Sequence, residues 1–341
     1  MPKRNDLTVR EGDTLTPGGF VRTLAQKPII SVFLGGDGRE KDTVLLLGLV
    51  SREVRGVRSP FVYEASKNGM RDHIEVADLT AAFAVDPGTS VLVIGPVQGV
   101  KDDGSFVQRT GESDKAVILK PRDLDVLPQG SLFLAGRLPG WAKEHMTDRG
   151  IAFEEILSRD DFAFYNAVPT AEGAVYLAIG NTDFTLFGSN VAVLGFGRTG
   201  IVMARTLQGL GARVTVVARN PGARSGAWAL GYATMDFGAF TTNPSRFDVI
   251  FNTVPALVIT AEVIDRLRKD CLIIDLASSP GGTDFEAAAK RGLKALLAPG
   301  LPAKFAPKTA SKILAMVIAD AVAKNWPHLA PDLDRIGGEL L

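Results

Sequence analysis

Cysteine and histidine are both scarce in this chain of 341 residues. It holds one cysteine, Cys271, and three histidines that lie far apart, His73, His145 and His328. One thiol can form neither an intrachain disulfide nor a cysteine-based metal site. The histidines lack the short spacing of a helical metal-binding pair, so we expect no bound metal.

The chain also lacks an excess of charge of either sign and a long apolar run. Its 38 lysines and arginines balance 38 acidic residues, which leaves no electrostatic footprint for nucleic acid or an anionic membrane. No uncharged apolar stretch reaches the roughly 18 residues of a membrane span. The N-terminal residues lack the apolar core of a signal peptide. We therefore expect a soluble, cytoplasmic protein with no nucleic-acid or membrane partner.

Strand-like and helix-like runs alternate over most of the chain, which predicts an α/β fold with parallel sheets. We predict a smaller flavodoxin-like N-terminal α/β domain and a C-terminal Rossmann domain with a doubly wound parallel sheet. The predicted order is a leader at 1–27, the N-terminal substrate domain at 28–165, the Rossmann domain with a connecting helix at 166–310, and a C-terminal helix and tail at 311–341 that pack back on the N-terminal domain.

Secondary structure can be assigned along both halves from the apolar runs and their turns. Predicted strands in the first half are 28–34, 91–94 and 131–134, with a mixed helical stretch at 74–84 and a polar loop at 101–114. Predicted strands in the second half are 191–194, 213–217, 248–252, 272–276 and 294–297. Predicted helices are one that Pro169 opens and that ends at Gly180, one at 200–210, and one at 309–323.

The most informative motif is GFGRTG at Gly195–Gly200. It follows a four-residue apolar strand, opens a helix and precedes a second strand, which is the context of a dinucleotide-binding turn. Gly195 permits the tight turn, Gly197 lets the backbone approach a pyrophosphate, and Gly200 lets helix and strand pack closely.

The second strand of this unit ends without an acidic residue. Sites selective for NAD place Asp or Glu here to bind the ribose 2′-hydroxyl, whereas this chain has Arg219 and then Arg224. Guanidinium groups suit a 2′-phosphate. We therefore predict NADP as the cofactor, although both arginines can also be read as solvated surface charges.

Two further strand ends face the predicted cofactor, because ligands of doubly wound sheets lie beyond the carboxyl ends of the strands. Asp275 at one of them can be read as part of the site or as a cap for local backbone. The predicted cofactor-binding residues are Gly195, Gly197, Arg198, Thr199, Gly200, Arg219, Asn220, Arg224, Thr253, Val254, Pro255, Leu276 and Ala277.

Several longer motifs resemble the A subunit of dipicolinate synthase from spore-forming bacteria. They are RDD at 159–161, YNAVPTAEG at 165–173, NTD at 181–183, GFGRTG, DLASSPGGTDF at 275–285, KALLAPGLP at 294–302 and APKTA at 306–310, with GGDGR at 35–39 near the start. The similarity is faint between residues 40 and 150. Ser279 stands where some relatives have arginine.

This resemblance implies an enzyme, an NADP-dependent oxidoreductase acting on CH–CH groups. It would oxidise dihydrodipicolinate to dipicolinate, pyridine-2,6-dicarboxylate, during spore formation. It further implies the flavoprotein-like B subunit of dipicolinate synthase as partner and a location in the mother-cell cytoplasm of a sporulating bacterium. Apart from this resemblance, a Rossmann domain joined by a late-returning helix often dimerises through that region, so we expect a homo-oligomer.

A substrate with two carboxylates needs cations or helix N-termini to hold it, and its aromatisation releases a hydride and a proton. The general base is not identified by any motif. Glu172 can be read as a base or as a charge at a helix start. The candidates for holding substrate or handling protons are Arg39, Thr170, Glu172, Ser278 and Lys308.

Two other functions fit the same motifs. One is a dehydrogenase of D-2-hydroxyacids or alanine on the same two-domain plan, although the histidine that a hydroxyacid dehydrogenase uses as base is not evident. The other is a nucleotide-binding scaffold without catalytic activity, which would bind NADP and position a catalytic partner.

Overall fold

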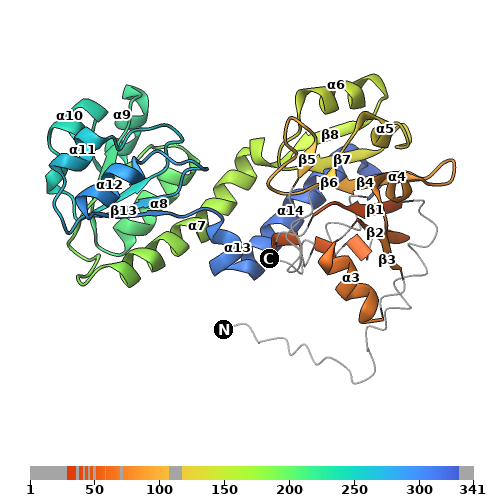
Figure 1. The fold of residues 1–341 in the computed structure, drawn as a ribbon, viewed down its shortest axis with the longest axis horizontal. Coiled ribbons are helices and arrows are strands. Elements are labelled where there is room, and N and C mark those ends of the chain that lie inside the picture. Colours follow the sequence, from red (N-terminus) through yellow and green to blue (C-terminus); the bar gives the residue numbers. More distant parts are fainter. Residues whose placement is uncertain are drawn as a thin grey trace, which may run out of the picture. The chain divides into compact units, whose positions relative to one another are not determined.

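The computed structural model describes residues 29–35, 38–40, 43–44, 47–48, 51–57, 59–69, 72–106 and 117–329, in two compact units (Figure 1). One unit holds the described residues up to Glu155 together with those from Ile318, and the other spans Ile156–Val317. The predicted leader at 1–27 and the end of the predicted tail lie outside the described residues. The domain boundaries proposed from the sequence stay a prediction.

The first unit is built on a six-stranded parallel sheet in the order β3-β2-β1-β4-β7-β8. Its strands are β1 (Ile29–Phe33), β2 (Glu53–Val57), β3 (His73–Val76), β4 (Ser90–Ile94), β7 (Leu132–Ala135) and β8 (Ala152–Glu155). Its helices are α3 (Pro60–Lys67), α4 (Leu79–Phe83), α5 (Pro121–Leu124) and α6 (Gly140–Asp148), with an antiparallel pair of β5 (Ser105–Phe106) and β6 (Val117–Ile118). All of β1 is buried, as expected of a central strand with both faces covered.

The second unit repeats this topology, with the order β11-β10-β9-β12-β13-β14. Its strands are β9 (Asn190–Leu194), β10 (Arg213–Val217), β11 (Ala233–Met235), β12 (Val249–Asn252), β13 (Leu272–Asp275) and β14 (Lys294–Leu297). Its helices are α7 (Asp160–Asn181), α8 (Arg198–Gly209), α9 (Pro221–Ala229), α10 (Phe237–Thr242), α11 (Ala261–Arg266), α12 (Phe285–Arg291), α13 (Leu301–Phe305) and the first half of α14 (Pro307–Asn325).

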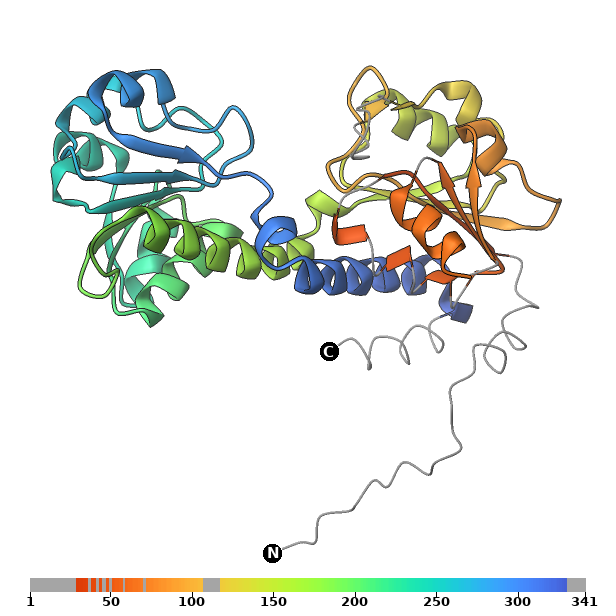
Figure 2. The same cartoon turned by 60° about the horizontal axis from the view of Figure 1, so that its bottom comes forward.

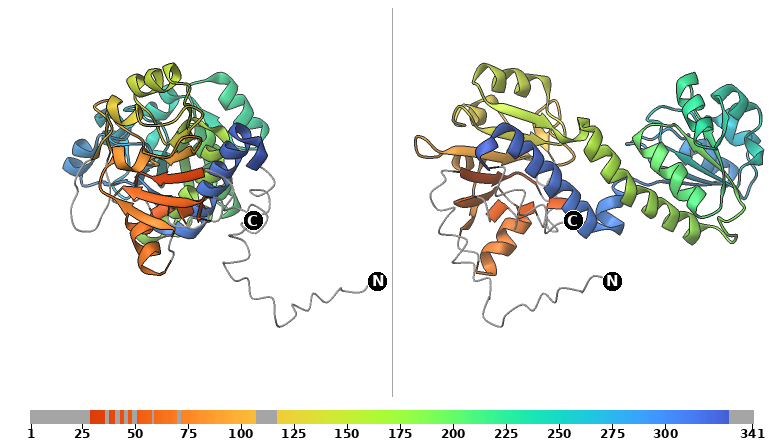
Figure 3. Two further views of the ribbon diagram at one scale, coloured as in Figure 1. Left: turned by 90° about the vertical axis from the view of Figure 1, so that its right-hand side faces the viewer. Right: turned by 180° about the vertical axis from the view of Figure 1, so that it is seen from behind.

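Helices cover both faces of the second sheet (Figure 3). Val191 and Val193 of β9 pack in a core with α7 and α8, whereas Ala192 and Leu194 pack in a second core with α10, α11 and α12. Successive side chains of a strand point to opposite faces of the sheet, so the uninterrupted apolar sequence of β9 follows from this double coverage.

The predicted class of two α/β domains is confirmed. Counted along the chain, both sheets have the strand order 3-2-1-4-5-6, the order of dinucleotide-binding sheets. We predicted a flavodoxin-like N-terminal domain. Its sheet is parallel as expected, while flavodoxin itself has the order 2-1-3-4-5.

Two sequence assignments were wrong and several strands were missed. The predicted helical stretch at 74–84 is β3 followed by α4, because the side chain of Asp78 accepts the amide of Ala81 and starts the helix there. The connecting helix begins at Asp160, nine residues before Pro169, and continues through that proline. The missed strands β2, β3, β8 and β11 are short and partly polar, so they lack the apolar runs that marked the central strands. The two-residue strands β5, inside the predicted loop at 101–114, and β6 were missed as well.

The end of α14 belongs to the first unit. Asn325 Nδ2 donates to Glu154 Oε1 over 3.1 Å, and Trp326 Nε1 donates to the carbonyl oxygen of Gly130 over 3.3 Å.

Among the helices that the structure describes, none is long and apolar enough to cross a membrane. The described residues also contain no group of three or more His, Cys, Asp or Glu able to hold a metal ion.

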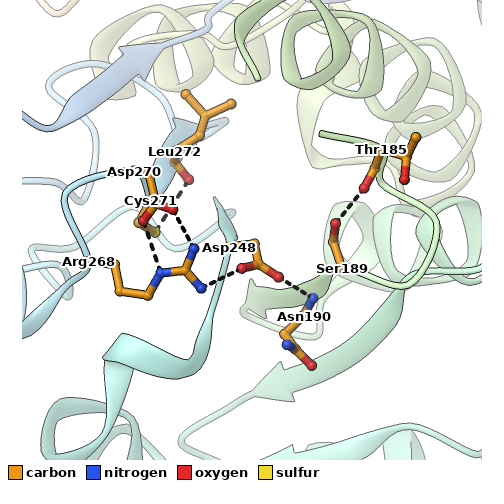
Figure 4. Close-up of polar contacts among 8 residues, drawn as sticks. All are labelled: Thr185, Ser189, Asn190, Asp248, Arg268, Asp270, Cys271 and Leu272. Carbon is orange, nitrogen blue, oxygen red and sulfur yellow. Dashed lines mark hydrogen bonds and ion pairs between the residues drawn. The ribbon is translucent and has the colours of Figure 1, made fainter. Parts of the chain in front are cut away.

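A charged cluster fixes the amino ends of the strands in the second sheet (Figure 4). Asp248 accepts the amide of Asn190 over 2.7 Å and an Nη1 hydrogen of Arg268 over 2.8 Å, and Arg268 also pairs with Asp270. Burial raises the pKa of the neighbouring Cys271 thiol to about 12. A thiol that stays protonated at neutral pH is a poor nucleophile, so Cys271 is not a candidate for nucleophilic catalysis.

Candidate functional site

The GFGRTG turn connects β9 to α8 at the carboxyl edge of the second sheet, and two of its glycines are required by the fold. Gly195 has φ = 92°, a conformation that side chains rarely adopt, and a Cβ there would lie 2.5 Å from Thr253 Oγ1. A Cβ on Gly200 would lie 2.2 Å from the carbonyl oxygen of Gly195. Neither position can take a larger residue without a shift of the turn.

Gly197 differs from both. Its backbone is extended, with φ = −89° and ψ = −166°, and a Cβ there would meet no atom within 4 Å. Nothing in the packing of the described residues therefore calls for glycine at this position. Glycine is required at this position if a ligand approaches the backbone closely, as a pyrophosphate does in a dinucleotide-binding turn.

Gly197 is the N-cap of α8, and no side chain of the described residues caps this helix. The first amides of a helix point outward without intrahelical partners, and the helix dipole adds partial positive charge. The first turn of α8 holds no acidic residue and begins with Arg198. These features make a site for an anion.

Arg198 is held by an acidic residue of the neighbouring helix. Its Nη1 donates to Asp160 Oδ1 over 2.6 Å, which joins the starts of α8 and α7. Beside this pair, Arg159 binds Asp161 with two hydrogen bonds, and these bonds hold the pKa of the Asp161 carboxyl below its usual value. Both side chains of the Arg198 pair are exposed, so the pair adds little stability and leaves Arg198 at the mouth of the turn.

The three predicted cofactor residues after β10 differ in the contacts that their side chains make. Arg219 is exposed, and the structure shows no hydrogen bond or ion pair of its side chain with the described residues. Asn220 caps α9 by accepting the amide of Gly222 over 2.7 Å. Arg224 Nη1 donates to the carbonyl oxygens of Ala218 and Arg219, 2.8 Å each. Among the described residues of this strand end, Arg219 is thus the cation left free, and Arg224 shapes the loop.

A buried polar network joins the ends of β12 and β13. The Asp275 carboxylate is fully buried. Its Oδ1 accepts Asn252 Nδ2 and the amide of Ala277, and its Oδ2 accepts the amide of Gly282 and the hydroxyl of Thr283. Asp275 therefore organises the loop at 276–283, which supports the interpretation of this residue as a cap for local backbone.

The remaining predicted cofactor residues lie along this same edge. Thr253 donates its hydroxyl to the carbonyl oxygen of Leu194 over 2.8 Å and covers the glycine turn. Pro255 is exposed, and Val254 and Leu276 are half-buried. Ala277 is buried, and its backbone amide donates a hydrogen bond to Asp275 Oδ1. Thr199 is half-buried in the first turn of α8.

The candidates for substrate binding and proton transfer are spread over several elements. Thr170 and Glu172 lie on opposite sides of α7. The Thr170 hydroxyl donates a hydrogen bond to the carbonyl oxygen of Asn166. Glu172 lies in the middle of this helix and is exposed, so the predicted alternative of a helix-start charge was wrong. Ser278 is exposed in the loop after β13, and Lys308 is exposed at the second position of α14.

Arg39 lies in the first unit, where it is buried in the short 3₁₀ helix at Gly38–Glu40 after β1. The neighbouring Gly36 and Asp37 of the GGDGR motif lie outside the described residues.

All three histidines also belong to the first unit. His73 is buried, which lowers its pKa, and His145 pairs with Asp125. The described part of the dinucleotide-binding unit thus has no histidine to act as a base.

Sequence reasoning missed the partners that organise the site. Asn252 and Thr283 were not assigned roles, and Asp160 was noted as part of the RDD motif and not as the partner of Arg198. The signal for Asn252 and Asp275 was available, since each polar residue ends a buried apolar strand. The contact between Asp160 and Arg198 spans 38 positions of sequence and could not be read from spacing.

Comparison with known proteins finds the same relative by sequence and by structure, the A subunit of dipicolinate synthase. The chain is 40% identical to the A subunit of dipicolinate synthase of Bacillus subtilis over 237 residues, 68% of this chain and 77% of that protein. The crystal structure of the A chain of dipicolinate synthase from Bacillus subtilis matches with 32% identity and a TM-score of 0.76, covering 90% of this chain and 99% of that one. The crystal structure of the A subunit from Bacillus halodurans matches with 32% identity and a TM-score of 0.72, covering 87% and 98%.

More distant proteins share the fold alone. A structure of L-alanine dehydrogenase matches with 14% identity and a TM-score of 0.51, covering 90% of this chain and 92% of that one. No family model matches the chain.

Proposed function

The chain belongs to the family of the dipicolinate synthase A subunit, and on this premise we propose that it oxidises dihydrodipicolinate to dipicolinate with NADP⁺. The reaction removes a hydride and a proton from the dihydropyridine ring and yields pyridine-2,6-dicarboxylate, NADPH and a proton. The observation that carries the proposal is the open space at Gly197 over an uncapped helix start. That space fits a bound pyrophosphate.

The residues present fit a dinucleotide. The glycine turn and the amides of α8 would hold the pyrophosphate, with Arg198 beside it. Thr253, Val254 and Pro255 would line one side, and Leu276 and Ala277 the nicotinamide end. When bound, the nicotinamide supplies the hydride acceptor.

Arg219 supports NADP over NAD. Its guanidinium is exposed beyond β10 and its strand end carries no carboxylate, so it is available to a 2′-phosphate through charge-assisted hydrogen bonds. Asn220 and Arg224 would support this loop through the contacts described above.

The substrate carries two carboxylates, which cations of the chain would offset. Arg39 and Lys308 are the candidate cations, and the Ser278 and Thr170 hydroxyls are candidate hydrogen-bond partners. Glu172 is exposed and is a candidate to receive the ring proton, directly or through water. We further propose that the chain works with the flavoprotein-like B subunit of dipicolinate synthase in the mother-cell cytoplasm of a sporulating bacterium.

The test is dipicolinate formation from freshly generated heterocycle by the purified chain, with NADP⁺ or NAD⁺ and with or without the B subunit. The expected result is dipicolinate and NADPH formed in equal amounts, only when the dinucleotide is present and faster with the B subunit. NADP⁺ binding without turnover in every mixture would favour the scaffold alternative. Turnover of alanine or a 2-hydroxyacid instead would favour the other dehydrogenase.

The cofactor preference has a separate test. Replacing Arg219 by glutamate is expected to weaken NADP⁺ binding by about 10- to 100-fold, because one charge-assisted bond contributes about 1.5–3 kcal/mol. NAD⁺ binding should change by less than about threefold. Calorimetric titration of both dinucleotides measures this difference. Arg213→Glu, at the exposed start of the same strand, is the matched control and should change neither affinity, whereas equal losses for NADP⁺ and NAD⁺ in Arg219→Glu would rule out recognition of the 2′-phosphate.

A further inference from the structure

The RDD motif at 159–161 starts the long helix α7, and its side chains form two separate ion pairs. Arg159 binds Asp161 with two hydrogen bonds, of 3.0 and 2.6 Å, and Asp161 also accepts the amide of Phe162. Asp160 instead reaches the neighbouring helix, where its Oδ1 accepts a hydrogen of Arg198 Nη1 over 2.6 Å. Because Arg159 engages Asp161, the acid of this motif that holds Arg198 is Asp160.

The pair with Asp160 anchors Arg198 where α7 and α8 start side by side. The two helices pack against each other in one apolar core, and Figure 2 shows α7 running along one face of the second sheet. Arg198 is the first residue of α8 and follows the uncapped Gly197. Its side chain is therefore fixed beside the helix start that the proposed function assigns to a pyrophosphate.

Asp160 engages one corner of the guanidinium and leaves another edge available. The contact uses Nη1 alone, and the structure shows no hydrogen bond from Arg198 Nε or Nη2 to the described residues. The five N–H donors of a guanidinium form a rigid fork, and its Nε and Nη2 hydrogens point the same way, which suits two oxygens of one phosphate. The Arg198 side chain is 49% exposed, so a ligand can reach it.

We propose that Asp160 is a positioning residue of the dinucleotide site, which holds Arg198 by Nη1 so that its Nε–Nη2 edge binds a phosphate of the pyrophosphate. The inference rests on the proposed function and adds to that site a residue that does not itself touch the ligand. An arginine side chain loses rotamer freedom when it binds a ligand, and a partner on the neighbouring helix restricts that freedom beforehand. The exposed pair adds little stability, so its effect falls on binding.

The Asp160 carboxylate also has an opposite effect, because it repels an anion bound nearby. The charge of Arg198 offsets this repulsion, and solvent screens the two exposed side chains. We therefore expect positioning to outweigh repulsion. Since the two effects change the affinity in opposite directions, removal of the carboxylate distinguishes them.

The test is a double-mutant cycle on NADP⁺ affinity, measured by titration calorimetry. Arg198→Ala is expected to weaken binding about 10- to 100-fold, as the loss of a charge-assisted hydrogen bond does. Asp160→Ala should weaken it about 2- to 10-fold, because Arg198 must then be ordered on binding. In the Arg198→Ala background, Asp160→Ala should have no further effect. Asp160→Asn keeps an acceptor oxygen and should fall between Asp160→Ala and the wild type.

Two further measurements separate positioning from a structural role. NAD⁺ should weaken by the same factor as NADP⁺ in Asp160→Ala, because both carry the pyrophosphate, whereas Arg219→Glu acts on NADP⁺ alone. Thermal unfolding of Asp160→Ala should stay within about 4 °C of the wild type. The matched control is Asp183→Ala, which removes an exposed carboxylate just beyond the other end of α7 and should bind both dinucleotides like the wild type.

Tighter or unchanged NADP⁺ binding in Asp160→Ala would overturn the inference and leave the cofactor site itself intact. An equal loss from Asp160→Ala with and without the Arg198 side chain would also overturn it, because the effect would not pass through Arg198. If Asp160→Ala does not fold, the isosteric Asp160→Asn takes its place in the cycle. A wild-type chain that binds neither dinucleotide would refute the proposed cofactor site and this inference with it.

Discussion

Replacing Gly197 by alanine is expected to weaken dinucleotide binding by about 10- to 100-fold while leaving the stability of the fold unchanged. The backbone at this position suits any residue, and the new methyl group would meet no atom of the protein within 4 Å. It would instead fill the space into which the pyrophosphate approaches the start of α8. The loss corresponds to about 1.4–2.7 kcal/mol of binding free energy.

Titration calorimetry with NADP⁺ and thermal unfolding of the same preparation measure the two effects separately. Gly209→Ala is the matched control, because it adds a methyl group into open space at the other end of α8. It should bind normally and gain a little stability from the higher helix propensity of alanine. Gly200→Ala should lose both binding and stability, because its Cβ collides with the carbonyl oxygen of Gly195. Unchanged NADP⁺ affinity in Gly197→Ala would contradict the assigned site.

Replacing Asp275 by alanine is expected to destabilise the dinucleotide-binding unit by about 3–5 kcal/mol, the cost of several buried hydrogen-bond donors left unpaired. The change removes the acceptor of the Ala277 and Gly282 amides and of the Thr283 hydroxyl, and leaves these buried donors without a partner. Each such loss costs about 1–3 kcal/mol. Thermal unfolding should show the transition of this unit lowered by about 10 °C.

A graded series tests this assignment. Asp275→Asn keeps one acceptor oxygen but turns an amide group toward the donor Asn252 Nδ2, so it should lose nearly as much stability. Thr283→Val removes one donor and should lose less. Asp265→Ala, whose side chain is exposed, should stay within about 0.5 kcal/mol of the wild type. If Asp275→Ala and Asp265→Ala unfold at the same temperature, the buried network contributes no stability.

The amino-acid sequence by itself determined the features that depend on neighbouring residues. Central strands such as β9, β10 and β13 are short apolar runs between turns, and the glycine turn is recognisable because its strand, glycines and helix are contiguous. The family resemblance depends on the same contiguous motifs, and the relatives confirm it. The absence of an acid after β10 is likewise local, although the cofactor preference drawn from it awaits its test.

Only the tertiary structure decided which of these residues are free to act. Arg198, Arg219 and Arg224 are alike in sequence, yet Arg198 is paired with Asp160, Arg224 with two carbonyl groups, and Arg219 with no described residue. Asp275 and Glu172 are both carboxylates, but one is buried in four hydrogen bonds and the other exposed on α7. Burial and long-range partners set the energy of a charged group, and both arise only when segments distant in the chain are packed together.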